Sequence, residues 1–154
     1  DSLPVMRAIL IPLLLALSSC TAVPQAIPLP GTGATRGPFI PRDEFPVPPN
    51  VERLIGPEDC RGSTLAAVSA DIPDYPVRAW SLGRQGWVVV RFDVEANGDV
   101  DNVRIARAVP DGPFNRESRQ TVRAWQFRPL DAGVDRLDNC VVMFEFRAGE
   151  VALR

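Results

Sequence analysis

The side chains of this sequence that could do chemistry are three cysteines, several hydroxyl groups and 19 carboxylates. The 154 residues include no histidine, the side chain that most often serves as a general base or metal ligand near neutral pH. The candidate nucleophiles Ser81, Ser118 and Thr121 therefore have no histidine to activate them. We predict that the protein is not an enzyme.

Four carboxylates flank a predicted turn in the middle of the chain: Asp93, Glu95, Asp99 and Asp101. A calcium site needs a defined loop of ligands, and the surrounding sequence does not contain one. We interpret these residues as solvated strand and turn positions, and we predict neither a metal nor another cofactor. The formal net charge of −2 also argues against nucleic acid as a partner, because that partner needs a clustered positive surface.

Cys20 follows a hydrophobic run that begins after a single positive charge. This is the layout of a secretory signal, and the run of about ten residues is too short for a membrane-spanning helix, which needs roughly 20. The stretch LSSC at residues 17–20 resembles the bacterial lipobox. The resemblance implies a lipoprotein signal over residues 1–19, with residues 1–5 upstream of it, and a lipid on Cys20. An ordinary secretory signal is the alternative.

Cys60 and Cys140 remain as a pair once Cys20 is lipidated. Beyond the cytoplasmic membrane the surroundings are oxidising, which favours disulfides. We predict a bridge between the two, which would close a loop of about 80 residues and constrain the unfolded chain by about 4 kcal/mol. Two free buried thiols are the alternative.

Residues 22–57 are rich in proline and include the stretches PLPGTGATRGP and FPVPPN. Proline removes backbone donors and favours extended polyproline geometry. We therefore predict that residues 20–57 form a lipidated periplasmic tether without a packed core, and that the folded domain comprises residues 58–154. A proline motif that serves as a ligand for a partner is the alternative.

The clearest local signal in this domain is a β-hairpin. Asn97-Gly98 favours a tight turn because both residues tolerate positive φ. Apolar residues alternate with other residues on both sides of this turn, as expected for strands with one apolar face. They are Val88, Val90, Phe92 and Val94 before the turn, and Val103 and Ile105 after it.

Two helices and a third strand complete the domain. Pro76 and Gly83 are placed to begin and end a short helix, and residues 140–147 alternate as a strand with Phe144 and Phe146 facing the core. The second helix carries an apolar stripe at helical spacing, Phe114, Ser118, Val122 and Trp125. The order helix-strand-strand-helix-strand predicts an α+β domain with a three-stranded antiparallel sheet and both helices on one face. Whether residues 60–72 add a strand stays open.

This order and these residues resemble the C-terminal domain of the TonB energy-transducer family, from about residue 74 to residue 146. The resemblance rests on YPVRAWSLGRQG, VVRFDVEANGDVDNVRI, PF followed by a helix, and RAWQFRP, in the family's order and spacing. In that family the domain grips the TonB box, a short extended segment of outer-membrane transporters, by adding it as a strand beside its own last strand.

The resemblance implies which residues of this chain would bind such a peptide. Residues 140–147 would be an unpaired docking strand, with Val141, Met143 and Glu145 as outward contacts and Tyr75 near the docking site. The alternative is that these are ordinary sheet and core positions. A bridge at Cys140 would pin the docking strand, and no such bridge belongs to the family pattern.

The chain also departs from the family in its membrane attachment. TonB transducers carry a transmembrane helix whose histidine couples to a proton-driven motor, and this chain has no histidine. We therefore predict a lipid-anchored binding module on the periplasmic side of the envelope, at the outer rather than the inner membrane, without energy coupling of its own. The alternatives are a TonB-type energy transducer and a structural envelope protein that forms homodimers through its edge strand.

Overall fold

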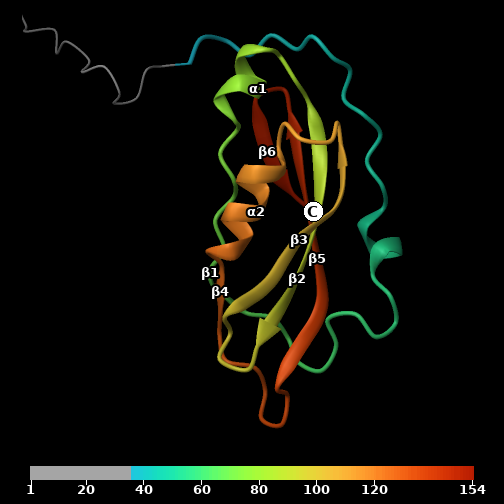
Figure 1. Ribbon diagram of the computed structural model, residues 1–154, viewed down its shortest axis with the longest axis vertical. Helices are drawn as coiled ribbons and strands as arrows, with labels where there is room; N and C mark the ends of the chain where they lie inside the picture. Colours follow the sequence, from blue (N-terminus) through green and yellow to red (C-terminus); the bar gives the residue numbers. More distant parts are fainter. Residues whose placement is uncertain (1–35) are drawn as a thin grey trace, which may run out of the picture. The chain divides into compact units, whose positions relative to one another are not determined.

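The computed structural model describes residues 36–154. The predictions for Cys20, the signal sequence and the tether up to residue 35 lie outside the described residues. The described part, Arg36–Arg154, is one compact unit with the α+β architecture that the sequence predicts (Figure 1). None of the helices in residues 36–154 combines the length and the apolar character needed to cross a membrane.

The main sheet is antiparallel and has four strands in the order β3-β2-β5-β6. Its strands are β2 (Gly86–Glu95), β3 (Val100–Val109), β5 (Arg136–Arg147) and β6 (Glu150–Leu153). The prediction of three strands is wrong because the chain turns back after β5. Ala148 and Gly149 have φ angles of 52° and 82°, and two successive positive φ values make a tight hairpin turn.

The hairpin of β2 and β3 confirms the turn predicted at Asn97-Gly98. The amide of Glu95 donates to the carbonyl of Asp99 at 2.8 Å. Gly98 has a φ of 89°, and a Cβ atom built there would overlap the carbonyl oxygen of Phe127. Only glycine meets both requirements at this position.

Two helices, α1 (Val77–Ser81) and α2 (Asn115–Arg123), cover one face of the sheet (Figure 1). The predicted stripe of Phe114, Ser118, Val122 and Trp125 is buried against that face. The phenylalanines of β5 contribute the facing side chains, since Phe144 and Phe146 belong to the same core cluster. Both helices therefore lie where the sequence predicts.

A second sheet of two short strands lies beside the main one. It pairs β1 (Ala67–Ser69) with β4 (Gln126–Phe127) in antiparallel register. The segment at residues 60–72, which the sequence leaves open, thus contains a strand of three exposed residues.

Residues 36–57, which we call the arm, pass over α1 at their start and then lie along the face of the sheet opposite the helices (Figure 1). The arm contains a short 3-10 helix, η1 (Val51–Leu54). Its side chains Phe45, Val51 and Leu54 pack on a cluster of β2 and β5 residues. The compact unit begins at Arg36, so this part of the predicted spacer is folded onto the domain instead of standing free.

Candidate peptide-binding edge of the sheet

The strand β5, which the sequence predicts to be the docking strand, is an inner strand. It pairs with β2 along its length and with β6 over residues 144–147. At the end of β6, the amide of Met143 donates to the carbonyl of Arg154 at 3.1 Å, and the amide of Arg154 donates back at 2.9 Å. The prediction that residues 140–147 form an unpaired edge is therefore wrong for residues 143–147. The missed signal is the Ala-Gly turn followed by two spaced apolar residues, Val151 and Leu153.

β6 is short and partly exposed, so it pairs with only one end of β5. It has four residues, and the side chain of Leu153 is 47% exposed. Because antiparallel bonding alternates, the amide of Ala152 faces β5 like that of Arg154, whereas those of Val151 and Leu153 face outward. Within residues 36–154 no strand pairs with that outward edge.

The edge of β5 beyond β6 is only partly occupied. Asn139 has a φ of 57°, which marks a bulge where the register of β5 against β2 shifts. The carbonyl of Asp138 turns outward there and accepts a hydrogen bond from the amide of Cys60 at 2.7 Å. Between Asp138 and Met143, no strand in the described part of the chain pairs with β5 on this side.

The three predicted peptide contacts on β5 share one face of the sheet, opposite the helices. Met143 is 2% exposed and packs with Trp87 and Val89, and Val141 lies at the border of this cluster. The side chain of Glu145 is 13% exposed, and its nearest cation is Arg154 at 3.7 Å. The arm partly covers this face, so the three side chains are less open than the sequence predicts.

A groove remains where the arm, β5 and the end of β6 meet. It has a volume of about 430 Å³ and is lined by Met143, Glu145 and Arg154 together with arm residues 48–52. Two glutamates, Glu52 and Glu145, contribute acidic groups to its walls. The groove lies beside the backbone of the candidate docking edge.

Tyr75 lies on the other face, in the main core. Its ring packs against Phe146 with centroids 5.5 Å apart, and its hydroxyl donates to the carbonyl of Arg84. Burial raises the pKa of Tyr75 to about 12. The structure therefore does not bring Tyr75 together with the three β5 residues. Tyr75 instead supports the strand from behind.

The structure contains the predicted disulfide between Cys60 and Cys140, with Cα atoms 4.6 Å apart. Cys140 is 1% exposed within the main core. The bridge fixes the segment that follows the arm to the middle of β5, next to the bulge at Asn139. It thus holds the candidate edge in place, as the sequence analysis expects.

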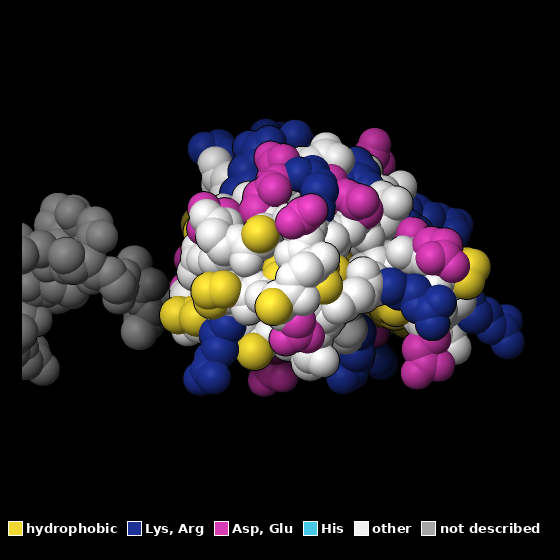
Figure 2. Space-filling model, turned by 90° about the horizontal axis from the view of Figure 1, so that it is seen from below, with side chains coloured by type: hydrophobic (Ala, Val, Ile, Leu, Met, Phe, Trp, Pro, Cys, Tyr) yellow, Lys and Arg dark blue, Asp and Glu magenta, His cyan; other side chains and the backbone are white. Residues whose placement is uncertain are grey.

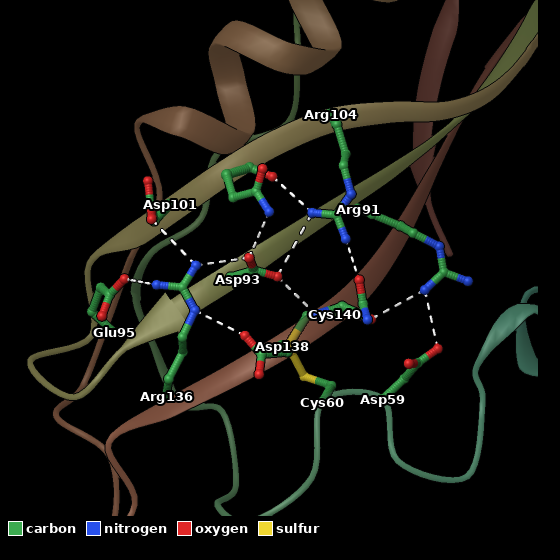
Figure 3. A network of polar contacts seen from close by, with 12 residues as sticks. Asp59, Cys60, Arg91, Asp93, Glu95, Asp101, Arg104, Arg136, Asp138 and Cys140 are labelled. Carbon is green, nitrogen blue, oxygen red and sulfur yellow. Dashed lines mark hydrogen bonds and ion pairs between the residues drawn. A yellow bond between two sulfur atoms is a disulfide. The ribbon is translucent and has the colours of Figure 1, made fainter.

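A network of ions lies on the same end of the sheet (Figure 3). Arg136 donates to Asp93 and Asp138 at 2.8 Å each and to Asp101 at 3.3 Å, and it also contacts Glu95. Within residues 36–154 no group of acidic or cysteine side chains is arranged to hold a metal ion. The guanidinium of Arg136 lies among the carboxylates of this network and pairs with them.

Asp93 is the buried centre of this network, at 3% exposure. Burial alone would raise the pKa of Asp93. Hydrogen bonds from the Asn139 amide and the Asn102 side chain outweigh that effect, and Arg136 and Arg104 act in the same direction, so the pKa lies below its ordinary value. The interpretation of Asp93 as a solvated residue is wrong, because its carboxylate fixes the bulge that shapes β5.

One side of the domain carries side chains of both signs of charge. Figure 2 shows acidic and basic side chains side by side over one end of the molecule. This face offers no continuous positive surface of the kind that nucleic acid requires.

Sequence reasoning missed the side chains that hold the arm. Trp80, Gln85, Trp87 and Arg91 each donate a side-chain hydrogen bond to an arm carbonyl. One signal could have found them, namely the unbroken apolar run of residues 87–90 in β2. A strand with apolar residues on both faces is expected to be covered on both faces.

Comparisons with known proteins point to one family. Residues 72–147 match the family described as Gram-negative bacterial TonB protein C-terminal. The TonB protein of Yersinia enterocolitica is 40% identical over 84 residues, which are 54% of this chain and 30% of that protein. The TonB protein of Escherichia coli K12 is 44% identical over 67 residues, 44% of this chain and 28% of that protein.

A solution structure of the Pseudomonas aeruginosa TonB C-terminal domain has a TM-score of 0.48 and 30% sequence identity. That alignment covers 58% of this chain and 91% of the solved domain. The chain spans less than a third of the length of the two full-length relatives.

Proposed function

This chain belongs, through residues 72–147, to the family of the TonB protein C-terminal domain, and we propose that it is a periplasm-facing module that captures an extended peptide by β-strand addition. Proteins of this family are energy transducers or binding proteins and not enzymes, in agreement with the prediction from the sequence that this chain is not an enzyme. The proposed partner is a TonB box-like segment of an outer-membrane TonB-dependent transporter.

The state of the β5 edge carries this proposal. Before Met143 the edge of β5 has no strand partner among the described residues. After Met143 the edge pairs with β6, a strand of only four residues. An incoming peptide that takes the place of β6 would bond to the backbone of Met143 and Glu145 and continue towards Val141. Such main-chain bonding is largely independent of the peptide's sequence. Selectivity would come from the groove beside Met143 and Glu145.

The experiment titrates TonB-box peptides into the protein and follows amide chemical shifts. Two proline substitutions in β6 distinguish the two edges that a peptide could use. Ala152→Pro removes a donor that faces β5, and Leu153→Pro removes one that faces outward. If the peptide displaces β6, Ala152→Pro tightens binding by about threefold or more because the resident strand competes less, and Leu153→Pro changes it little.

Two results contradict this arrangement. Loss of binding on truncation after Arg147, together with weaker binding by Leu153→Pro, would show that the peptide adds to β6 itself. A folded protein that binds no peptide at millimolar concentration would refute strand capture altogether.

We also propose that the protein is tethered by a lipid on Cys20 and has no energy coupling of its own. Support comes from the LSSC stretch at residues 17–20 and from the lack of histidine. Labelling cells with a palmitate analogue should mark the wild-type protein and not Cys20→Ala. Membrane retention of an unlabelled protein would instead favour a TonB-type energy transducer.

Self-association through sheet edges is a second candidate function. It is favoured by one observation, that β3 and β6 both have an edge without a strand partner within residues 36–154. Sedimentation over a range of concentrations tests it. A concentration-dependent dimer that Leu153→Pro abolishes would support homodimers through β6, and a monomer throughout would exclude them.

A further inference from the structure

The arm is held mainly through its own backbone carbonyls. The indole N–H of Trp80 donates to the carbonyl of Gly37 at 3.2 Å. Trp87 does the same to Val47, also at 3.2 Å. Two further side chains repeat the pattern, Gln85 towards Asp43 at 2.8 Å and Arg91 towards Leu54 at 2.6 Å. The four donors come from the start of the domain, from α1 to the middle of β2.

This mode of contact suits the composition of the arm. The arm contains Pro38, Pro41, Pro46, Pro48, Pro49 and Pro57. Proline has no N–H, so the carbonyls are the main-chain groups that such a segment offers to a binding site. Aromatic-lined grooves that recognise polyproline segments exploit the same preformed extended geometry.

Three of the apolar side chains that the arm packs against the domain recur at a constant spacing, and Leu54 of η1 packs beside them. Phe39, Phe45 and Val51 are spaced six residues apart, which is two turns of a helix with three residues per turn. All three face the domain. Phe39 packs on Trp80 with ring centroids 5.3 Å apart, and Phe45 lies 5.0 Å below the guanidinium of Arg147.

Two glycines of the domain leave room for the arm. A Cβ atom built on Gly83 would overlap the carbonyl oxygen of Ile40. At Gly149 a Cβ would lie 2.9 Å from the Cβ of Phe39 and from the ring of Trp80. The amide of Arg42 also donates to the carbonyl of Gly83 at 2.9 Å. The surface is thus shaped for close approach of a backbone and not only for apolar cover.

We infer that α1 and the helix-free face of the sheet form a binding site for an extended, proline-rich segment with an apolar side chain at every sixth residue, and that the chain's own arm is its resident ligand. The site adjoins the β5 edge, because Met143 lies under the arm and also beside that edge, but it does not depend on peptide capture there. The disulfide at Cys60 keeps the arm close to the site. Release would lengthen the tether by about 70 Å, at ~3.1 Å for each of ~22 residues.

The first test compares two glycine substitutions in the full chain. Gly83→Ala places a methyl group against the arm, whereas Gly133→Ala meets no atom within 4 Å. Both glycines have positive φ, 61° and 86°, so each substitution places an alanine in the left-handed region of the backbone. Trypsin cleavage after Arg42, followed by mass spectrometry, reports release of the arm. Gly83→Ala should accelerate this cleavage by about tenfold or more relative to Gly133→Ala, because cleavage follows the open population.

The second test asks whether the site accepts a ligand from outside. A synthetic peptide of residues 36–55 is titrated into Phe45→Ala protein, and the indole N–H signals of Trp80 and Trp87 are followed by NMR. Binding should be saturable, and weaker to wild-type protein, whose resident arm competes. A Phe39→Ala, Phe45→Ala version of the peptide is the control and should bind less. Equal cleavage of the two glycine variants, or no binding to Phe45→Ala protein at millimolar peptide, would overturn the inference.

Discussion

The disulfide between Cys60 and Cys140 should account for a large share of the stability of this domain. The bridge joins residues separated by 80 positions, for which the loop-closure entropy of the unfolded chain corresponds to about 4.5 kcal/mol at 25 °C. Small domains unfold with roughly 5–15 kcal/mol in total. We therefore expect the Cys60→Ala, Cys140→Ala variant to lose about 4 kcal/mol and to melt roughly 15 °C lower.

Urea denaturation followed by tryptophan fluorescence measures this loss, because Trp87 and Trp125 are buried. Wild-type protein in reductant is the control and should lose a similar amount. Alanine is chosen in place of serine because Cys140 is 1% exposed, and a buried hydroxyl would add its own cost. A difference below about 1 kcal/mol between oxidised and reduced protein would refute the reasoning, since it would mean that the unfolded chain is already restricted.

Three further substitutions test other parts of the structure by the same denaturation assay. Asp93→Asn should flatten the acid side of the plot of unfolding free energy against pH. The lowered pKa of the Asp93 carboxyl stabilises the wild-type fold at neutral pH, and that stability is lost as the pH falls below about 4. Equal pH profiles of the variant and the wild type would contradict this role. Gly98→Ala should lower the free energy of unfolding by about 2–4 kcal/mol. The control Gly112→Ala should lower it by roughly 1 kcal/mol, because Gly112 also has positive φ but a Cβ atom there would meet no atom within 4 Å. Similar losses in the two variants would show that the overlap with Phe127 does not matter. Ser118→Ala should be neutral or stabilising by up to about 1 kcal/mol, since the buried hydroxyl has no partner in the described part of the chain, and a clear loss would indicate an unseen partner.

The sequence predicts those helices, strands and turns whose formation is visible in local residue patterns, such as apolar residues that repeat because one face is buried. The stripe from Phe114 to Trp125 repeats at helical spacing because one side of α2 meets the sheet. The Asn97-Gly98 turn was predictable because glycine permits the positive φ that Gly98 adopts there. In both cases the information is local, so no distant partner had to be known.

The arm could not be predicted in this way. Proline content describes the local backbone, which is extended whether the segment stands free or lies on a surface. Its docking depends on donors such as Trp80 and Trp87, about 40 residues further along the chain. Only the two-sided apolar run in β2 hinted that the second face of the sheet is covered.

The candidate site shows the same division. The sequence placed Val141, Met143 and Glu145 on one face because strand alternation fixes which side chains share a face. It did not show that β6 occupies the edge, because a four-residue strand has too few positions for a periodic signal. Tyr75 was assigned to the docking site from the resemblance alone, and the packing of its ring against Phe146 was invisible to that argument.

The arm and β6 together determine how an extended peptide could approach β5. The helices close one face of the sheet and, while the arm is in place, it closes much of the other, so the docked arm leaves a peptide little room across either face of the strand. What remains is the edge, where a peptide would meet backbone groups and, beside them, only the side chains of the groove. Displacing β6 also removes Arg154 from Glu145, which leaves a largely buried carboxylate without its cation. Since such a group is costly unless paired, a peptide with a basic side chain opposite Glu145 would fit this edge better than an acidic one.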